Sequence, residues 1–333
     1  DFSLRGGYNT SKYAFSFDNG QTWTEGFVPL NGSDYPVTSD GYTWEANSDP
    51  VVAIGNNGNV FLVDLYFNAS NSANGLYVGV GSITGGAGSI SAGTAVVAPN
   101  LSATTSDSED KPWLTVDNSA TGTDGNVYVS WTHFAGSTDY ILVSRSADHG
   151  NTWTTPVQVS PTSQNGAVQG SQVAVGPDGT VYVAYEVFYV GNKRQQYMAM
   201  STDGGTTFSA PVAVTPLFNE LSFNSTYRKN SFPAIAADPT SGDIFMVYSD
   251  QPSHGSGAEV EFVLVNMASS TFTAPLVIND VSSGQQFMPS IAVDDTGVGH
   301  SSWFDTRNSP RRLCRYRSRR RERSPSLDQW RVQ

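Results

Sequence analysis

Apolar runs, turn residues and aromatic-rich runs recur along the chain in a fixed order. Each repeat has an apolar run, then a turn rich in Gly, Asn and Asp, then a run of β-branched and aromatic residues. The repeats begin near residues 50, 112, 172, 233 and 289, a period of about 60. Two such runs around a tight turn predict a β-hairpin. A fixed period with one small sheet per repeat indicates a propeller or a solenoid.

A second pattern, S-x-D-x-G-x-T-W/F, occurs at residues 16–23, 146–153 and 201–208. Ser and Asp side chains hydrogen-bond backbone groups in tight turns, and Gly supplies a positive φ. The closing Trp or Phe begins a strand and buries a large apolar surface. We therefore expect Asp18, Asp148 and Asp203 to be structural residues of turns between the third and fourth strands of a sheet, without a part in catalysis.

This turn pattern resembles the Asp-box, or BNR repeat, of the sialidase-like β-propellers. The three copies and the repeated hairpins extend over nearly all of residues 1–306. The resemblance implies an all-β propeller of four-stranded blades around a central channel. It also implies a secreted glycoside hydrolase that acts on glycans or polysaccharides.

Sialidases grip the carboxylate of their substrate with three arginines and use a Tyr–Glu pair and an Asp in catalysis. The resemblance makes Arg228, Arg307 and Arg194 the candidates for the arginine roles. Their first arginine lies in an F/Y-R-I-P motif, which the segment around Arg5 does not match. The sequence therefore favours the fold of this family over its specificity for sialic acid.

The period divides the β-propeller domain, residues 1–306, into repeats 1–46, 47–107, 108–166, 167–225, 226–283 and 284–306. The first repeat holds only an outer hairpin and the last only an inner hairpin. Five blades result if these halves join, and six if both terminal blades are incomplete. Residues 307–333 form an atypical tail with ten Arg. Three explanations are open: the tail completes a blade, it docks on the acidic surface of residues 1–306, or it reflects a frame slip or cloning artefact.

Composition limits the function classes. Charged residues make up 14% of the chain, which is low for a helical protein, and the single Cys314 excludes an intrachain disulfide. No run approaches the roughly 20 apolar residues of a membrane span. Residues 1–306 carry 28 acidic and eight basic side chains, which argues against a nucleic-acid partner. We expect a monomer, secreted on the grounds of the resemblance and its acidic, Ser/Thr/Asn-rich surface.

Strand direction predicts which loops share one face of a propeller. The loop before the first strand of a blade and the loop after the second lie at one end, and the Asp-box turns lie at the other. Loops of the first kind carry Asp49, Glu109, Asp110, Lys111, Arg228 and Lys229. The second strands end at or near Tyr66, Trp131, His133, Glu186, Tyr189, Asp250, Trp303, Asp305 and Arg307.

Carboxylates among aromatic side chains suit a carbohydrate, and paired carboxylates suit glycoside hydrolysis. Glu186 and Asp250 are the first catalytic candidates, because aromatic neighbours favour a raised carboxyl pKa. Asp49, Asp110 and Asp305 follow, although each loop acid is also consistent with a solvated surface residue. The predicted substrate-binding residues are Arg228, Arg307, Tyr66, Trp131, His133, Tyr189 and Trp303.

Other chemistries have weaker support. The four His residues show no metal-ligand spacing, and the chain has neither an EF-hand nor a phosphate-binding loop. We expect no metal and no cofactor, with Ca²⁺ in an acidic loop left open. The leading hypothesis is a glycoside hydrolase with carbohydrate as its partner. The alternative is a non-catalytic propeller that binds carbohydrate or protein.

Overall fold

The computed structural model describes residues 3–5, 8–32, 35–68, 70, 72–83, 88–101, 107–189, 191–223, 229–252, 257–307, 318–321 and 330–332. Strands and turns dominate these residues, whose one helical element is a 3₁₀ turn at Thr162–Gln164. The prediction of an all-β fold is confirmed. The chain forms two compact units: the first is Asp1–Gly166 with Gly205–Thr207, and the second is Ala167–Gly204 with Phe208–Gln333.

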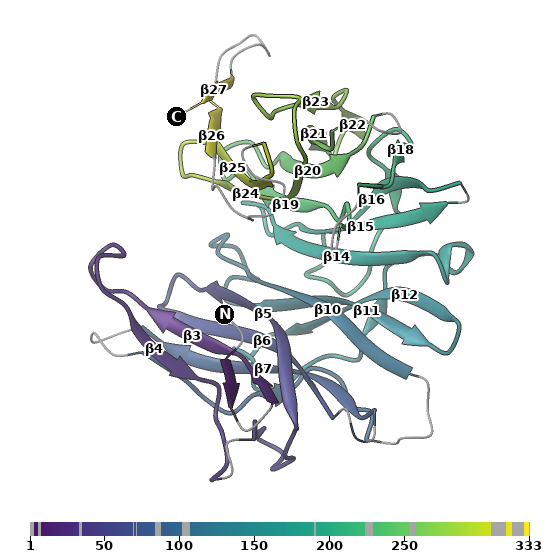
Figure 1. Ribbon diagram of the computed structural model, residues 1–333. Coiled ribbons are helices and arrows are strands. Elements are labelled where there is room, and N and C mark those ends of the chain that lie inside the picture. Colours follow the sequence, from purple (N-terminus) through teal and green to yellow (C-terminus); the bar gives the residue numbers. More distant parts are fainter. Residues whose placement is uncertain are drawn as a thin grey trace. The chain divides into compact units, whose positions relative to one another are not determined.

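The first unit contains two antiparallel sheets of four or five strands, shown in blue in Figure 1. One consists of β5 (Ala46–Ile54), β6 (Asn59–Phe67), β7 (Asn74–Ser82), β8 (Ser89–Ile90) and β9 (Thr94–Ala95). The other consists of β10 (Asp107–Val116), β11 (Val127–Ala135), β12 (Thr138–Ser146) and β13 (Val157–Gln158). Two hairpins precede them, β1 (Ser3–Arg5) with β2 (Tyr8–Thr10) and β3 (Lys12–Phe15) with β4 (Thr24–Phe27).

The second unit contains three such sheets, coloured teal to yellow in Figure 1. The first consists of β14 (Val168–Val175), β15 (Val181–Tyr189), β16 (Lys193–Ser201), β17 (Val212–Ala213) and β18 (Phe218–Asn219). The next consists of β19 (Ala234–Ala237), β20 (Ile244–Asp250), β21 (Glu259–Asn266), β22 (Thr271–Phe272) and β23 (Leu276–Val277). The last consists of β24 (Gln286–Val293), β25 (Gly299–Asp305), β26 (Ser318–Arg321) and β27 (Trp330–Val332), so strands of the Arg-rich tail continue it.

Successive sheets within a unit pack face to face. The first strands lie next to one another, β5 beside β10 in one unit and β19 beside both β14 and β24 in the other. Apolar side chains from facing sheets form the cores; Ala184, Met198, Tyr248 and Val263 belong to one of them. All of β20 is buried, because this second strand packs on both of its faces and so lacks an exposed polar face.

A β-bulge recurs near the start of four first strands. The ladder shifts register after residues 48, 110, 169 and 287. The next residue in each case has a positive φ: Asp49, Lys111, Gly170 and Met288. At Gly170 a side chain would not fit, since its Cβ would lie 2.2 Å from the Phe232 ring. A bulge re-aims the side chains beside it, here those that begin the sheets.

The turns at residues 16–23 and 146–153 contain the predicted hydrogen bonds. Asp148 accepts the backbone N–H of Thr152 at 2.8 Å and its hydroxyl at 2.6 Å, while Ser146 Oγ accepts the N–H of Gly150 at 2.8 Å. Asp18 makes the same two bonds with Thr22. Led by the threonine hydroxyl, these bonds lower the pKa of both Asp18 and Asp148 to about 2. In the third turn Ser201 donates to Asp203 at 2.7 Å.

Candidate functional site

Each sheet has a mouth end, the end at which its first strand begins and its second strand ends. Strand register places several predicted residues there. Glu186 is opposite Gln169, and Asp305 is opposite Gln286. Asp250 is the last residue of β20. In the second unit the predicted catalytic residues Glu186, Asp250 and Asp305 therefore lie at the mouth ends of three successive sheets.

Glu186, Arg194 and Glu220 form a cluster, here called the Arg194 cluster, on the sheet that begins with β14. The Arg194 guanidinium lies between the two carboxylates, with Nε 3.5 Å from Glu186 and Nη2 2.8 Å from Glu220. Its Nη1 donates to the Lys193 carbonyl at 3.0 Å, and its Cζ lies 4.6 Å from the Phe188 ring centre. The Glu186 side chain is 1% exposed.

Burial is the main influence on Glu186 and raises its pKa to about 8, against the opposing charge of Arg194 and a long hydrogen bond from Gln196. Burial disfavours the charged form of a carboxyl, and one ion pair at 3.5 Å does not offset it here. Glu186 is therefore largely protonated at neutral pH. Among the described side chains around it, the buried atoms Gln196 Oε1 and Ser231 Oγ have no hydrogen-bond partner.

Four polar side chains line one face of the β20–β21 ladder, here called the acid ladder: Tyr248, Asp250, Glu259 and Glu261. Asp250 is directly opposite Glu259, and Tyr248 is opposite Glu261. The Tyr248 hydroxyl donates to Glu261 at 2.6 Å. Burial, reinforced by the neighbouring carboxylates, raises the pKa of Glu259 and Glu261. Burial also raises the pKa of Asp250.

The segment Phe218–Glu220 connects the acid ladder to the Arg194 cluster. The N–H of Asn219 donates to Asp250 at 2.9 Å, and Lys193 Nζ donates to Asn219 Oδ1 at 2.5 Å. The next residue, Glu220, contacts Arg194. Phe218 packs on the Tyr248 ring at 4.7 Å, above the apolar core between the two sheets.

Together the two groups hold five carboxyl side chains against the two cations Lys193 and Arg194. Burial is the main cause that raises the pKa of Glu186 and of the three carboxyls of the acid ladder. Neighbouring carboxyls with a raised pKa suit the donation and acceptance of a proton within one site.

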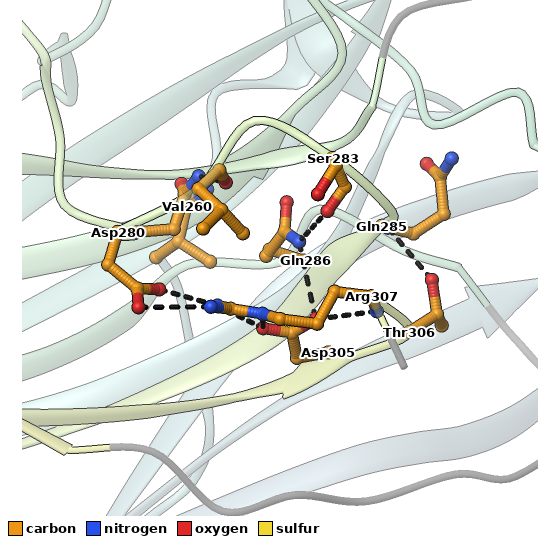
Figure 2. A network of polar contacts seen from close by, with 10 residues as sticks. Val260, Asp280, Ser283, Gln285, Gln286, Asp305, Thr306 and Arg307 are labelled. Atoms are coloured by element: carbon orange, nitrogen blue, oxygen red, sulfur yellow. Dashed lines mark hydrogen bonds and ion pairs between the residues drawn. The ribbon is translucent and has the colours of Figure 1, made fainter. Parts of the chain in front are cut away.

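Asp305 and Arg307, predicted as catalytic and substrate-binding residues, form a separate network that Figure 2 shows. Arg307 Nη1 lies 2.9 Å from Asp280, and its Nε donates to Asp305 at 2.5 Å. Burial alone would raise the pKa of Asp305, but the hydrogen bonds and charge of Arg307 lower it. Gly284 allows the 280–286 loop to approach Arg307 closely, because a Cβ at residue 284 would lie 2.8 Å from the backbone nitrogen of Arg307.

A third polar group lies in the first unit. Glu109 accepts the indole N–H of Trp131 at 2.5 Å and contacts His133 Nδ1 at 2.9 Å. Two backbone hydrogen bonds with the Asn74 side chain fix Glu109. The hydrogen bond to Glu109 is the main cause of the raised pKa of His133.

Three aromatic predictions require correction. Tyr66, Trp131 and Trp303 are 3%, 0% and 4% exposed, because each packs in an apolar or aromatic cluster. Their ring faces are therefore covered and do not offer a stacking surface for sugar. Tyr189 is exposed, and its hydroxyl lies 3.0 Å from that of Tyr197.

The remaining predicted residues are not brought into these groups. Asp49 lies half-buried on the bulge of β5, and Asp110 accepts the N–H of Lys111 at 2.8 Å in β10. Arg228 lies outside the described residues. No group of three potential metal-binding side chains occurs in the part of the chain that the structure describes, and no helix there is long and apolar enough to cross a membrane.

Sequence reasoning did not select Glu220, Glu259 or Glu261. A signal for the last two exists, since Glu259 and Glu261 alternate with Val260 and Phe262 along β21. Acids at every second position place two carboxylates on one face of a strand. Glu220 has no such signal, because its contact with Arg194 is set by the pairing of β18 with the start of β16.

Comparisons with known proteins support the fold. No known family and no curated protein matches the sequence. A protein of unknown function from Dyadobacter fermentans has a similar structure, with a TM-score of 0.56 and 16% identity over 82% of this chain and 78% of that one. The leech intramolecular trans-sialidase matches with a TM-score of 0.57 and 14% identity over 94% of this chain and 63% of its own.

The intramolecular trans-sialidase from Ruminococcus gnavus is also similar, with a TM-score of 0.56 and 13% identity over 93% of this chain and 86% of that one. At such low identity the likeness shows the fold alone. The predicted resemblance to sialidase-like β-propellers is therefore confirmed at the level of fold.

Proposed function

We propose that the protein is a glycoside hydrolase whose site is formed by the acid ladder and the Arg194 cluster. The observation that carries this proposal is the direct opposition of Asp250 and Glu259, two carboxyls that both have a raised pKa. Glycosidases use two carboxyls that flank the bond to be cleaved. The sialidase-like fold supports a carbohydrate substrate by analogy.

The surroundings suggest different roles for the two carboxyls. Asp250 accepts the N–H of Asn219 and is attracted by Lys193, and both interactions favour its ionised form. Glu259 experiences burial and the charge of Asp250, and both favour its protonated form. In the proposal Glu259 is the general acid and Asp250 is the nucleophile or base.

Glu186, the first candidate from sequence, has another role in this proposal. Its side chain is 1% exposed and contacts Arg194. A buried carboxyl without access to substrate acts through its neighbour, so we assign it as a positioning residue for Arg194. Its variant Glu186→Gln should change the pH profile of turnover more than its maximum.

The register also suggests a stereochemical outcome. Directly opposed residues in an antiparallel pair have Cβ atoms about 4.5–5.5 Å apart. Retaining glycosidases hold their two carboxyl groups about 5–5.5 Å apart, and inverting enzymes about 6.5–9.5 Å apart. Side chains that extend from so short a separation favour retention of configuration at the anomeric carbon.

The test is turnover on a panel of aryl glycosides and polysaccharides. Asp250→Asn and Glu259→Gln should each reduce turnover at least about a hundredfold, the low end for a positioned acid or base. Asp148→Asn, a matched change in an Asp-box turn of the first unit, should leave turnover unaffected. Wild-type rates in both ladder variants would place the catalytic site elsewhere, with Asp49, Asp110 and Asp305 next to be tested.

The second candidate is a propeller that binds carbohydrate without cleaving it. The observation in its favour is the burial of Glu186 and the engagement of Arg194 and Arg307 by protein carboxylates. Retention of the protein by a polysaccharide gel without release of sugar would support this function.

The proposal also includes a monomeric, secreted protein with five or six blades. Sedimentation tests the monomer, fractionation of the source cells tests secretion, and an experimental structure tests the number of blades.

A further inference from the structure

Each nitrogen of the Arg194 guanidinium contacts a polar atom of the protein. Its Nε faces Glu186, its Nη1 donates to the Lys193 carbonyl, and its Nη2 contacts Glu220 at 2.8 Å. A planar guanidinium is the side chain best suited to grip a sugar carboxylate. Here protein carboxylates occupy the directions from which a ligand carboxylate would bind.

The two carboxylates of the Arg194 cluster differ in access. The Glu186 side chain is 1% exposed, whereas that of Glu220 is 40% exposed. Glu220 is therefore the partner that a ligand arriving from solvent would meet and have to replace. Glu186 stays behind Arg194, protonated to a large extent at neutral pH.

The described side chains next to the Arg194 cluster also offer no free cation to a ligand carboxylate. Lys193 is committed to Asn219 at 2.5 Å. Asp250 of the adjoining acid ladder accepts the N–H of the same Asn219, and the ladder contains no cation that could attract a ligand carboxylate.

We propose that Glu220 is a specificity-determining residue: it occupies the anion-binding side of Arg194, so the site takes neutral glycans and excludes glycans that carry carboxylates. This inference rests on the proposed function of the site. It assigns to one partly exposed carboxylate the choice between two substrate classes. Removal of that charge should uncover Arg194 for an acidic sugar.

The test compares matched polymers by affinity electrophoresis. A panel of neutral polysaccharides is run beside the same polymers with their C6 hydroxyls oxidised to carboxylates. The wild-type protein should be retarded by at least one neutral polymer and not by its oxidised form. Glu220→Gln should bind the oxidised form at least about tenfold more tightly than wild type at low salt, and lose this gain at high salt.

Glu25→Gln is the matched control, since it removes one acidic charge from an exposed ion pair with Lys12 in the first unit. It should leave both affinities unchanged, which separates the effect on Arg194 from the change in net charge. Tighter binding of oxidised than neutral polymers by wild type would overturn this inference and leave hydrolysis standing. An unchanged preference in Glu220→Gln would also overturn it, and binding of neither polymer class would overturn both proposals.

Discussion

The second unit contains two arginines that each lie between two carboxylates, yet the two clusters behave in opposite ways. Arg307 donates to Asp305 through its backbone and its side chain, and to both oxygens of Asp280. The pKa of Asp305 is lowered as a result. Arg194 reaches Glu186 by a single contact of 3.5 Å, and the pKa of Glu186 is raised to about 8.

The comparison shows that the presence of a cation does not decide the ionisation of a buried carboxyl. Several short hydrogen bonds outweigh burial at Asp305, whereas one long contact does not at Glu186. The tightly paired Asp305 stays ionised and takes up a proton only at low pH. The loosely paired Glu186 keeps its proton near neutral pH, and such shifted pKa values are typical of residues in functional sites.

The largest expected effect on stability comes from removal of the Arg307 side chain. Arg307→Met should lower the free energy of unfolding by about 3–5 kcal/mol, because it leaves the buried Asp305 uncompensated. Arg194→Met should cost clearly less at pH 6, where Glu186 is already protonated. Urea unfolding of both variants at that pH measures the difference, and equal losses would contradict the contrast between the clusters.

Glu186 should make stability depend on pH. Its folded pKa of about 8 lies above the ordinary value, so the folded state holds a proton that the unfolded state loses. The associated stability is present below about pH 4.5 and is lost as pH rises to about 8. Relative to Glu186→Gln, the wild type should therefore lose stability by up to about 1.4 kcal/mol per pH unit in this window. Parallel slopes for the two proteins would show that Glu186 is ionised throughout.

Asp305 should give a smaller dependence of opposite sign. Its pKa is lowered in the folded state, so its stabilising effect is present above the ordinary carboxyl pKa and is lost as pH falls through the folded value. Asp305→Asn should cost about 2 kcal/mol at pH 7, typical of hydrogen bonds to a charged group. The cost should shrink towards pH 3 in thermal unfolding, and a constant cost across this range would argue against the ion pair as its origin.

The smallest effect is expected in an Asp-box turn, where the carboxylate is hydrogen-bonded but reached by solvent. Asp148→Ala should cost on the order of 1 kcal/mol or less, because water competes for the bonds that Thr152 makes. Turnover should persist. Differential scanning calorimetry together with an activity assay checks both, and loss of activity at an unchanged melting temperature would give the turn a functional role.

The sequence predicts local features well because each has a local cause. Hairpins follow from apolar runs around turn residues, and the bonds of Asp148 follow from a motif of eight residues. Pairings between segments distant in sequence have no such signal: Arg194 meets Glu220 only because the segment after β17 returns to the mouth end of β16. The burial of Trp131 was also missed, because a second strand packed on both faces lacks the alternation that separates inside from outside.

The bulges of the first strands determine how the fold responds to a change in length. Each inserts one extra residue into a ladder, so the pairs on its two sides differ by one position in register. Deletion of Lys111 would restore a uniform ladder that keeps Glu109 opposite His133 and Trp113 opposite Ser130. A one-codon deletion here would therefore remove the local bend of the strand without exchanging its two faces. Lineages of this fold can gain or lose such a bulge in one mutational step and re-aim the side chains at the mouth end, while the pairs on both sides persist.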